Sequence, residues 1–401
     1  MKLIKQCVAL LMTMTMVFTL GACARDEGDG DTSAVSLKVW GAQEDQAMLQ
    51  TMVENFKKDH SEQNYNITFG VVGEKDTQTK IMEDPEAAAD IFAFPDDQLN
   101  DLIKAGVLYE ITLDTEKIRT ENSEGSVSAA SVGNKLYAYP MTADNGYFLY
   151  YDKSVFNEED VKTMDGLLAA AAKRNKKVLM DISNGWYIAS FFLGAGCKLG
   201  LDENGKQTCD FNNENGVAAG EAIKAICAHS AFITGEDAIL TGGIGNTIAA
   251  GISGTWTADA IKEKLGENYA ATKLPTFTLA GKQVQMKSFA GYKLMGINSN
   301  TKRPKEAMKL AQYLTNETNQ LLRFEKRAMG PSNKKAAQNE KVKQNVALAA
   351  LASQNEYGIS QANVLSSTWQ PLEAFGTAME GKDYKKTTKE YLDAMVTQIT
   401  S

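Results

Sequence analysis

Apolar and polar positions alternate in a regular way from residue 35 onward. Val35–Trp40 alternates as a strand, and the apolar positions of Met48–Phe56 recur at helical spacing. Tyr65–Val71 alternates again, and Asp90–Phe94 has the apolar run of a buried strand. The helix after it is expected to end at Gly106, where a left-handed residue would stop it. Strands and helices in this order predict a mainly parallel α/β sheet.

A polar break separates two strands in the middle of the chain. Lys135–Tyr139 has a strand pattern, and Tyr147–Tyr151 is an aromatic strand. We interpret the segment between them as a crossing between two lobes, with Asp144 and Asn145 facing the gap. An ordinary β-hairpin with a polar turn is the alternative, and on local pattern alone the hairpin is the commoner structure.

A second set of helices and strands follows this crossing. Residues 178–182 are predicted to form a strand, and residues 290–298 a strand that crosses back to the first lobe. Residues 341–401 are expected to be helical. Ligands of such sheets bind beyond the carboxyl ends of the strands. That rule selects three segments that should converge on one edge: residues 43–45, residue 94 with 96–98, and residues 144–147.

The N-terminus has the pattern of a lipoprotein signal peptide over residues 1–22. Lys2 and Lys5 precede an apolar run over 8–20 that is too short for an ordinary membrane span. Small residues then precede Cys23, which would carry the lipid. A plain secretory signal with a coincidental cysteine is the alternative. Residues 23–34 would form a flexible acidic tether, which places the mature chain at the outer face of the cell membrane.

Length and charge narrow the function. A chain of 401 residues suggests about two domains, and 43% hydrophobic residues suggest a globular chain. The formal net charge is −8 and no basic cluster is visible, which argues against a nucleic-acid partner.

Three cysteines remain after Cys7 is removed and Cys23 is lipidated. A two-residue hairpin at Asn204-Gly205 would set Cys209 opposite Gly200 and not opposite Cys197. Whether those two cysteines pair stays open, and no disulfide framework is predicted. Cys227 has a helical context and is expected to be a buried small hydrophobe. No spacing suggests zinc.

No catalytic constellation stands out. The chain has many carboxylates but no pair marked as special, and both histidines, His60 and His229, have surface contexts. The glycine-rich segment 241–245 lacks the lysine of a phosphate loop and is more simply a turn. We therefore predict that the protein is not an enzyme and uses neither a cofactor nor a metal.

The order of these segments resembles the extracellular solute-binding proteins of carbohydrate ABC transporters, specifically the maltose/maltodextrin-binding group. The likeness covers nearly all of residues 35–399. The matching segments, in order, are Leu37–Trp40, Asp90–Phe94, Ala105–Leu108 with Ile111, Leu136–Pro140, Tyr150–Lys153, Gly245 with Ser253–Trp256, Leu274–Phe277, Gly296–Asn298 and Met329–Pro331. No single segment is diagnostic, but the full series in this order behind a lipidation signal is specific.

The resemblance implies a two-lobed α/β fold of the periplasmic-binding-protein kind. Each lobe would be a mainly parallel sheet flanked by helices, joined by hinge strands with a ligand cleft between. The N-terminal lobe would comprise 35–142 plus 294–340, and the C-terminal lobe 146–290 plus 345–401. The hinges would lie near 143–146, 290–294 and 340–345.

The resemblance also places ligand contacts on the first lobe. Phe94 matches an aromatic position and Asp97 an acid, whereas Gln98 departs from an expected basic residue. Asp144 or Asn145 stands where a glutamate is expected, and the choice between them stays open. For the acids of 43–45, a solvated helix N-terminus is the alternative. The first-lobe candidates are Gln43, Glu44, Asp45, Phe94, Asp97, Gln98, Asp144, Asn145 and Tyr147.

On the second lobe the candidates are aromatic. Trp186 and Tyr187 match an adjacent aromatic pair, although Asn184 or Gly185 replaces an expected acid. Trp256 and Trp369 match two further stacking positions, with core burial as the alternative for all four aromatics. Trp40 suits a core position as well as the cleft. Arg327 and Lys287 are further candidates, for which a solvated surface is the simpler interpretation.

A lipid-anchored, monomeric protein that captures maltooligosaccharides for import by ABC transporter permease subunits is the function that the resemblance implies. Sugars present flat apolar faces that stack on aromatic rings and hydroxyls that bond to polar side chains. A xylo-, galacto- or mixed-linkage oligosaccharide is the main alternative ligand. A secreted carbohydrate-active enzyme and an adhesin or scaffold are the other classes.

Overall fold

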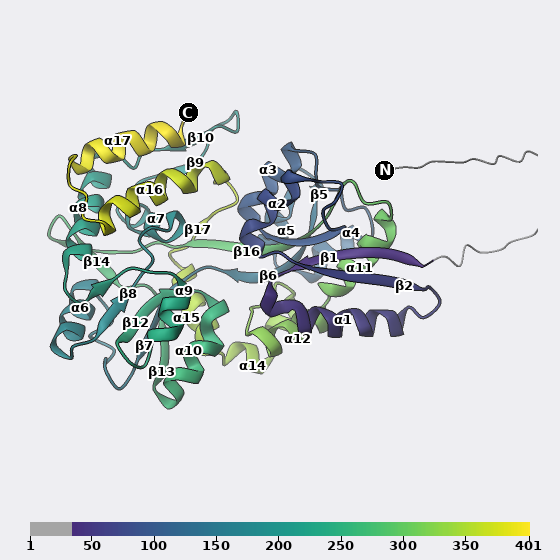
Figure 1. Ribbon diagram of the computed structural model, residues 1–401, viewed down its shortest axis with the longest axis horizontal. Helices are drawn as coiled ribbons and strands as arrows, with labels where there is room; N and C mark the ends of the chain where they lie inside the picture. Colours follow the sequence, from purple (N-terminus) through teal and green to yellow (C-terminus); the bar gives the residue numbers. More distant parts are fainter. Residues whose placement is uncertain (1–33) are drawn as a thin grey trace, which may run out of the picture.

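The computed structural model describes residues 34–401, which form two lobes side by side along the long axis of the molecule (Figure 1). The predicted signal peptide, the lipidated Cys23 and residues 24–33 of the tether lie outside the described residues. Within 34–401, no helix has both the length and the apolar character needed to cross a membrane.

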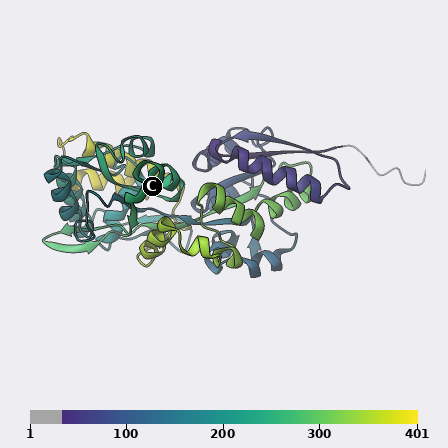
Figure 2. The ribbon, with the colours of Figure 1, turned by 90° about the horizontal axis from the view of Figure 1, so that it is seen from below.

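The first lobe is built on a sheet with the strand order β17-β16-β3-β1-β2, in which β6 also pairs with β16. β1 runs parallel to β2 and β3, whereas β16 runs antiparallel to β3 and β6. Figure 2 shows α1 beside α11 and α12 on one side of this lobe. The strands are β1 (Val35–Gly41), β2 (Tyr65–Val71), β3 (Ile91–Pro95), β6 (Ala138–Asn145), β16 (Phe289–Ile297) and β17 (Ile359–Ser360). The helices are α1 (Gln46–Asp59), α2 (Thr77–Glu83), α3 (Leu99–Lys104), α4 (Thr115–Glu121), α5 (Glu124–Ala129), α11 (Pro304–Leu314) and α12 (Glu317–Arg327).

The second lobe has a sheet with the order β11-β8-β12-β7-β13. β8 is parallel to β11 and β12, and β7 is antiparallel to β12 and β13. The strands are β7 (Phe148–Asp152), β8 (Lys177–Leu179), β11 (Phe232–Ile233), β12 (Ile248–Ser253) and β13 (Tyr269–Thr272). The helices are α6 (Met164–Lys173), α7 (Gly185–Gly194), α8 (Glu214–Ala228), α9 (Asp237–Gly243), α10 (Ala258–Leu265), α15 (Val346–Asn355), α16 (Trp369–Glu380) and α17 (Thr388–Ile399).

Short elements complete the described chain. Three two-stranded ribbons are β4 (Ser131–Val132) with β5 (Lys135–Leu136), β9 (Leu199–Leu201) with β10 (Gln207–Cys209), and β14 (Thr276–Leu279) with β15 (Lys282–Gln285). Two one-turn helices, α13 (Lys334–Ala337) and α14 (Glu340–Lys343), lead to α15.

The central polar stretch is a crossing and not a hairpin. β6 belongs to the first sheet and β7 to the second, so the chain changes sheets between Asn145 and Phe148. β16 crosses back: its Phe289 packs in the core of the second lobe and its Leu294 in the core of the first. β6 and β16 pair with each other and form a two-strand bridge between the lobes (Figure 1).

The two-lobed α/β fold is confirmed. The first sheet is mainly parallel, since β1 pairs in parallel with β2 and β3 and β16 pairs in parallel with β17, while β16 adds antiparallel pairings with β3 and β6. The second sheet is evenly mixed, with two parallel and two antiparallel pairings. In the first sheet both antiparallel pairings involve the bridge strand β16, because β6 and β16 pass between the lobes in opposite directions. A short strand, β17, also interrupts the region from 341 onward that was expected to be helical.

Several local predictions can be compared directly with the structure. α1 buries the predicted face, from Met48 to Phe56, and Gly106 has a positive φ of 70° two residues after α3. Ala328 ends α12 and has a left-handed backbone, with a φ of 54°. It was expected in the first lobe, but it packs with α15 in a hydrophobic cluster of the second.

The cysteine prediction was right in outcome and wrong in register. Cys209 lies opposite Leu199, because the loop holds three residues and not two, with Gly205 at a φ of 75°. Cys197, Cys209 and Cys227 are all free, and Cys227 is buried as predicted.

Candidate functional site

Three parallel strands bring three short polar turns to one edge of the first sheet. β1 leads into η1 (Gln43–Asp45), β2 into η2 (Glu74–Asp76) and β3 into η3 (Asp96–Gln98). The strands run in the same direction, so their carboxyl ends share one edge. The sequence analysis selected the first and third turns and missed the second, although the second obeys the same rule.

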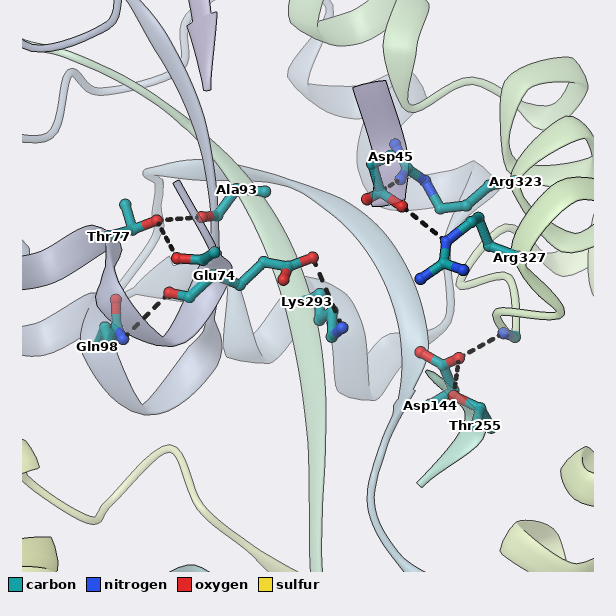
Figure 3. Close-up of polar contacts among 12 residues, drawn as sticks. Asp45, Glu74, Thr77, Ala93, Gln98, Asp144, Thr255, Lys293, Arg323 and Arg327 are labelled. Atoms are coloured by element: carbon teal, nitrogen blue, oxygen red, sulfur yellow. Dashed lines mark hydrogen bonds and ion pairs between the residues drawn. The ribbon is translucent and has the colours of Figure 1, made fainter. Parts of the chain in front are cut away.

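Asp45 is the centre of a buried ion-pair group with two arginines of α12. Its carboxylate accepts a bond of 3.0 Å from Arg327 Nε and one of 3.3 Å from Arg323 Nη1 (Figure 3). The side chains of Asp45 and Arg323 are only 4% and 2% exposed. Arg327 is therefore held in an ion pair with Asp45, and the solvated-surface interpretation was wrong for it. Gln43 and Glu44 are exposed.

A second charged group joins the missed turn to the crossing strand. Lys293 of β16 places its Nζ 3.6 Å from Glu74 Oε1 of η2 (Figure 3). The same Nζ lies 5.6 Å from the ring centroid of Trp256. Burial works to raise the pKa of the Glu74 carboxyl, but the Lys293 ammonium and a backbone hydrogen bond outweigh burial and lower it. Burial works to lower the pKa of Lys293, but Glu74, Asp144 and Asp45 together raise it. This pair is therefore held in its charged form.

Asp144 connects the crossing to the second lobe. Its Oδ2 accepts bonds from the Thr255 hydroxyl of η4 (Thr255–Thr257) at 2.8 Å and from the Gly330 backbone N–H at 2.7 Å (Figure 3). Asn145 instead pairs with Gly291 as part of the bridge between β6 and β16. Of the two candidates, Asp144 is the one whose side chain makes these contacts.

Three half-buried tryptophans of the second lobe lie beside these groups, and each has its indole N–H occupied. Trp186 Nε1 donates to Gln361 Oε1 at 2.8 Å, Trp256 Nε1 to Asp237 Oδ2 at 2.7 Å, and Trp369 Nε1 to Asp97 Oδ2 at 3.0 Å. The rings of Trp186 and Trp256 are 6.1 Å apart. A Cβ at Gly254 would lie 2.1 Å from the Trp256 ring, so glycine is needed there. Trp40, in contrast, is a core residue of the first lobe.

The turn η3 carries two buried acids, Asp96 and Asp97, which accept hydrogen bonds from Gln361 and Trp369. Asp96 accepts bonds from Gln361 Nε2 at 2.6 Å and from the Tyr292 backbone N–H at 3.1 Å. Burial, and to a lesser extent the charge of Asp97, raise the pKa of Asp96 to about 8. Burial raises the pKa of Asp97 to about 6, against hydrogen bonds that include the one from Trp369.

Some predicted site residues are buried in the first lobe, where their side chains are not available to a ligand. Phe94 is 0% exposed and packs beside Phe92 in the first core, because both rings point from β3 to the same face. Gln98 is buried, and its amide donates to the Lys75 carbonyl and accepts from the Gln78 N–H, so it supports η2.

Other predicted positions lie next to Trp186, and two of them bond to its backbone. Tyr147 is 0% exposed, and its hydroxyl donates to the Trp186 carbonyl at 2.8 Å. Tyr187 is buried in the second core. Asn184, where an acid was expected, caps α7 by accepting from the Trp186 N–H at 3.0 Å.

Buried polar atoms without partners gather among these groups. Within residues 34–401, Glu74 Oε1, Asp144 Oδ1, Asp96 Oδ2 and Arg323 Nε and Nη2 have no hydrogen-bond partner. Such atoms cost free energy unless a bound molecule completes them. Residues 34–401 contain no cluster of three histidine, cysteine or acidic side chains suited to a metal ion. The site offers acceptors, a guanidinium and aromatic faces, which suits a neutral ligand with many hydroxyls.

Sequence reasoning missed Glu74, Lys293 and Gln361. Glu74 follows the carboxyl end of β2 and could have been found by the rule that selected η1 and η3. Lys293 is a charged residue within the apolar strand 289–297, which is also a detectable signal. Gln361 lies in a polar segment without a periodic pattern, and no local signal marks it.

A cavity of about 350 Å³ lies elsewhere on the first lobe. It is lined by residues of α4 and α11 together with His60, Tyr139 and Pro140. None of the predicted site residues lines it, so it is separate from the junction between the lobes.

Comparison with known proteins gives consistent matches. The sequence pattern of the bacterial extracellular solute-binding protein family matches residues 51–350. The chain is 23% identical over 409 residues to the maltodextrin-binding protein MdxE of Bacillus subtilis (strain 168), covering 93% of this chain and 92% of that protein. One similar structure, described as "with acarbose", has a TM-score of 0.84 and 33% identity over 92% of this chain and 99% of that one. Another is the maltodextrin binding protein MalE1 from L. casei BL23 without ligand, with a TM-score of 0.77 and 26% identity over 92% of this chain and 100% of that one.

Proposed function

This chain belongs to the bacterial extracellular solute-binding proteins, and we propose that it captures maltooligosaccharides, chains of α-1,4-linked glucose, between its two lobes. Support comes from the relatives, since the curated relative and the L. casei structure are maltodextrin-binding proteins and a third was solved with acarbose. Solute-binding relatives also favour a protein that binds its ligand without transforming it. No cofactor enters this proposal.

The proposal rests on one observation: aromatic side chains of the second lobe and buried polar side chains of the first lobe and the crossings lie together where the lobes meet. The second lobe supplies Trp186, Trp256 and Trp369, which are half-buried and whose N–H groups are already bonded, so a ligand would meet them through the exposed part of each ring. The first lobe and the crossings supply Glu74 and Asp144, each with a buried oxygen that has no hydrogen-bond partner and can accept a bond from a hydroxyl. A glucan has apolar faces and a rim of hydroxyls, and it matches both.

Delivery to a transporter is the second part of the proposal. The lobes, 35–142 with 294–340 and 146–290 with 345–401, would close about hinges near 143–146, 290–294 and 340–345. The closed monomer would dock on ABC transporter permease subunits that import the sugar. Lipid at Cys23 would hold the protein at the outer face of the membrane.

Isothermal titration of the chain from Ala24 onward tests the ligand. Maltose, maltotetraose and a xylo-oligosaccharide would be compared, with tryptophan fluorescence recorded alongside. We expect maltotetraose to bind most tightly and to shift the fluorescence, because a longer glucan reaches more than one ring. If only the xylo-oligosaccharide gives a heat of binding, the ligand is a different oligosaccharide and the solute-binding role stands. If no sugar gives a heat of binding, sugar capture is contradicted.

A further inference from the structure

Gln361 occupies a position that no sequence pattern marks, and its amide is bonded on both sides. It is 1% exposed and follows β17. Its Oε1 accepts from Trp186 Nε1 at 2.8 Å, and its Nε2 donates to Asp96 Oδ1 at 2.6 Å and Asp97 Oδ1 at 3.3 Å. An indole N–H can only donate and a carboxylate mainly accepts, so these partners fix which way the amide points.

The network continues to a second tryptophan. Asp97 uses its other oxygen, Oδ2, to accept from Trp369 Nε1 at 3.0 Å. The chain of bonds therefore runs from Trp186 of α7 through Gln361 and Asp97 to Trp369 of α16. It ties two ring platforms of the second lobe to an acidic turn of the first.

The bridge between the lobes leaves room for this contact. Gly291 of β16 lies against Gln361, and a Cβ there would be 2.6 Å from Gln361 Cδ and 2.8 Å from Asp96 Oδ1. A side chain at 291 would push the amide away from the acids. The backbone of the neighbouring Tyr292 also donates to Asp96, so β16 and η3 hold the network from the same side.

We propose that Gln361 is a positioning residue that sets the orientation of Trp186 and Trp369 and couples it to the contact between the lobes. The inference rests on the proposed sugar capture. When the lobes separate, η3 moves away from α16, and the bond between Asp97 and Trp369 must break. Trp369 then keeps its bond to Asp97 only while the lobes are together, so the alignment of that ring becomes part of closure.

Two substitutions of Gln361 separate positioning from simple packing. Gln361→Met removes all three hydrogen bonds of the amide and keeps the length of the side chain. We expect it to weaken maltotetraose binding about tenfold at every pH, because a buried partner is lost on each side. Gln361→Glu keeps the acceptor for Trp186 but places a third carboxylate against Asp96 and Asp97, with Asp101 and the Tyr292 ring as the other titratable groups nearby. Its binding should be weak at pH 8 and recover toward wild type at pH 5, where these carboxyls take up protons.

Gln354→Met is the matched control, since Gln354 is also fully buried but bonds to Leu274 and Met286, outside this network. It should lower Tm without changing affinity or its pH profile. Wild-type affinity of Gln361→Glu at pH 8, or an equal loss in Gln354→Met, would overturn the positioning role.

Fluorescence of the ligand-free variants keeps this test independent of the ligand. Gln361→Met should shift tryptophan emission relative to wild type and Gln354→Met should not. If the wild type binds no sugar, the proposed function fails, and the emission of the ligand-free variants still decides the positioning role. Identical emission from all three proteins would contradict it.

Discussion

The Trp256 ring is held in place by close packing on Gly254 and by the bond from its N–H to Asp237. Under the proposed function, a glucose unit stacked on this fixed ring should contribute directly to affinity. Replacing it by alanine removes a face worth about 1 kcal/mol beyond its buried area. We expect Trp256→Ala to weaken maltotetraose binding at least about fivefold in isothermal titration.

Trp40→Phe is the control for this substitution. Trp40 is 9% exposed and lies in the first core, so its substitution should lower Tm and leave affinity unchanged. Equal affinities for Trp256→Ala and wild type would remove Trp256 from the site.

Asp96 should make stability depend on pH. Its pKa is raised from 3.8 to about 8 by burial first and by Asp97 second. The folded state therefore binds this proton more tightly than the unfolded chain, and stability falls as pH rises from about 4 to about 8. Asn mimics the protonated acid, so the Tm advantage of Asp96→Asn over wild type should grow across that range.

The exposed Asp76 supplies the comparison for Asp96. Asp76→Asn should change Tm by a similar small amount at pH 5 and pH 8. A constant difference between Asp96→Asn and wild type across pH would show that Asp96 is not a buried, proton-binding group.

At the residue scale, the sequence predicts residue type better than residue direction. Trp186, Trp256 and Trp369 were selected because each follows small or polar residues and not an apolar run, and each is half-buried. Phe94 was misplaced because direction on a strand alternates with every residue, and only the position of Phe92 beside it shows which face it takes. Gln98 was misplaced because its partners, Lys75 of η2 and Gln78 of α2, lie about 20 residues earlier in the chain.

At the scale of elements, the contact between η1 and α12 should be a main source of stability in the first lobe. Asp45→Ala would leave Arg323 buried without its counter-ion, which typically costs about 3–5 kcal/mol. Urea unfolding should show a loss of this size. The adjacent Glu44 is exposed, and Glu44→Ala should change the free energy of unfolding by less than about 0.5 kcal/mol. Similar losses for both variants would contradict a buried ion-pair group.

Helices were easier to predict than sheet pairing. α1 buries the face that its own periodicity gives, since local spacing determines it. β17, in contrast, has two residues and pairs with Phe289 and Ala290, about 70 positions earlier. Mixed sheets also could not be foreseen, because strand direction depends on partners that are distant in sequence.

At the scale of the whole molecule, the two crossings explain how polar groups from both lobes meet. Asp144 and Lys293 lie on the bridge strands β6 and β16, and they contact Thr255 and Glu74 from opposite lobes. The strand patterns on both sides of the polar break at 140–147 suggested the first crossing, and the second was expected from the single strand over 290–298. The site is therefore assembled from groups of both lobes.

Small-angle X-ray scattering of the chain from Ala24 onward, with and without saturating maltotetraose, tests capture by lobe closure most directly. Titration on the same sample would establish that the site is occupied. The account predicts a smaller radius of gyration with the sugar, because hinge closure brings the lobes together. Identical scattering profiles at full occupancy would contradict it.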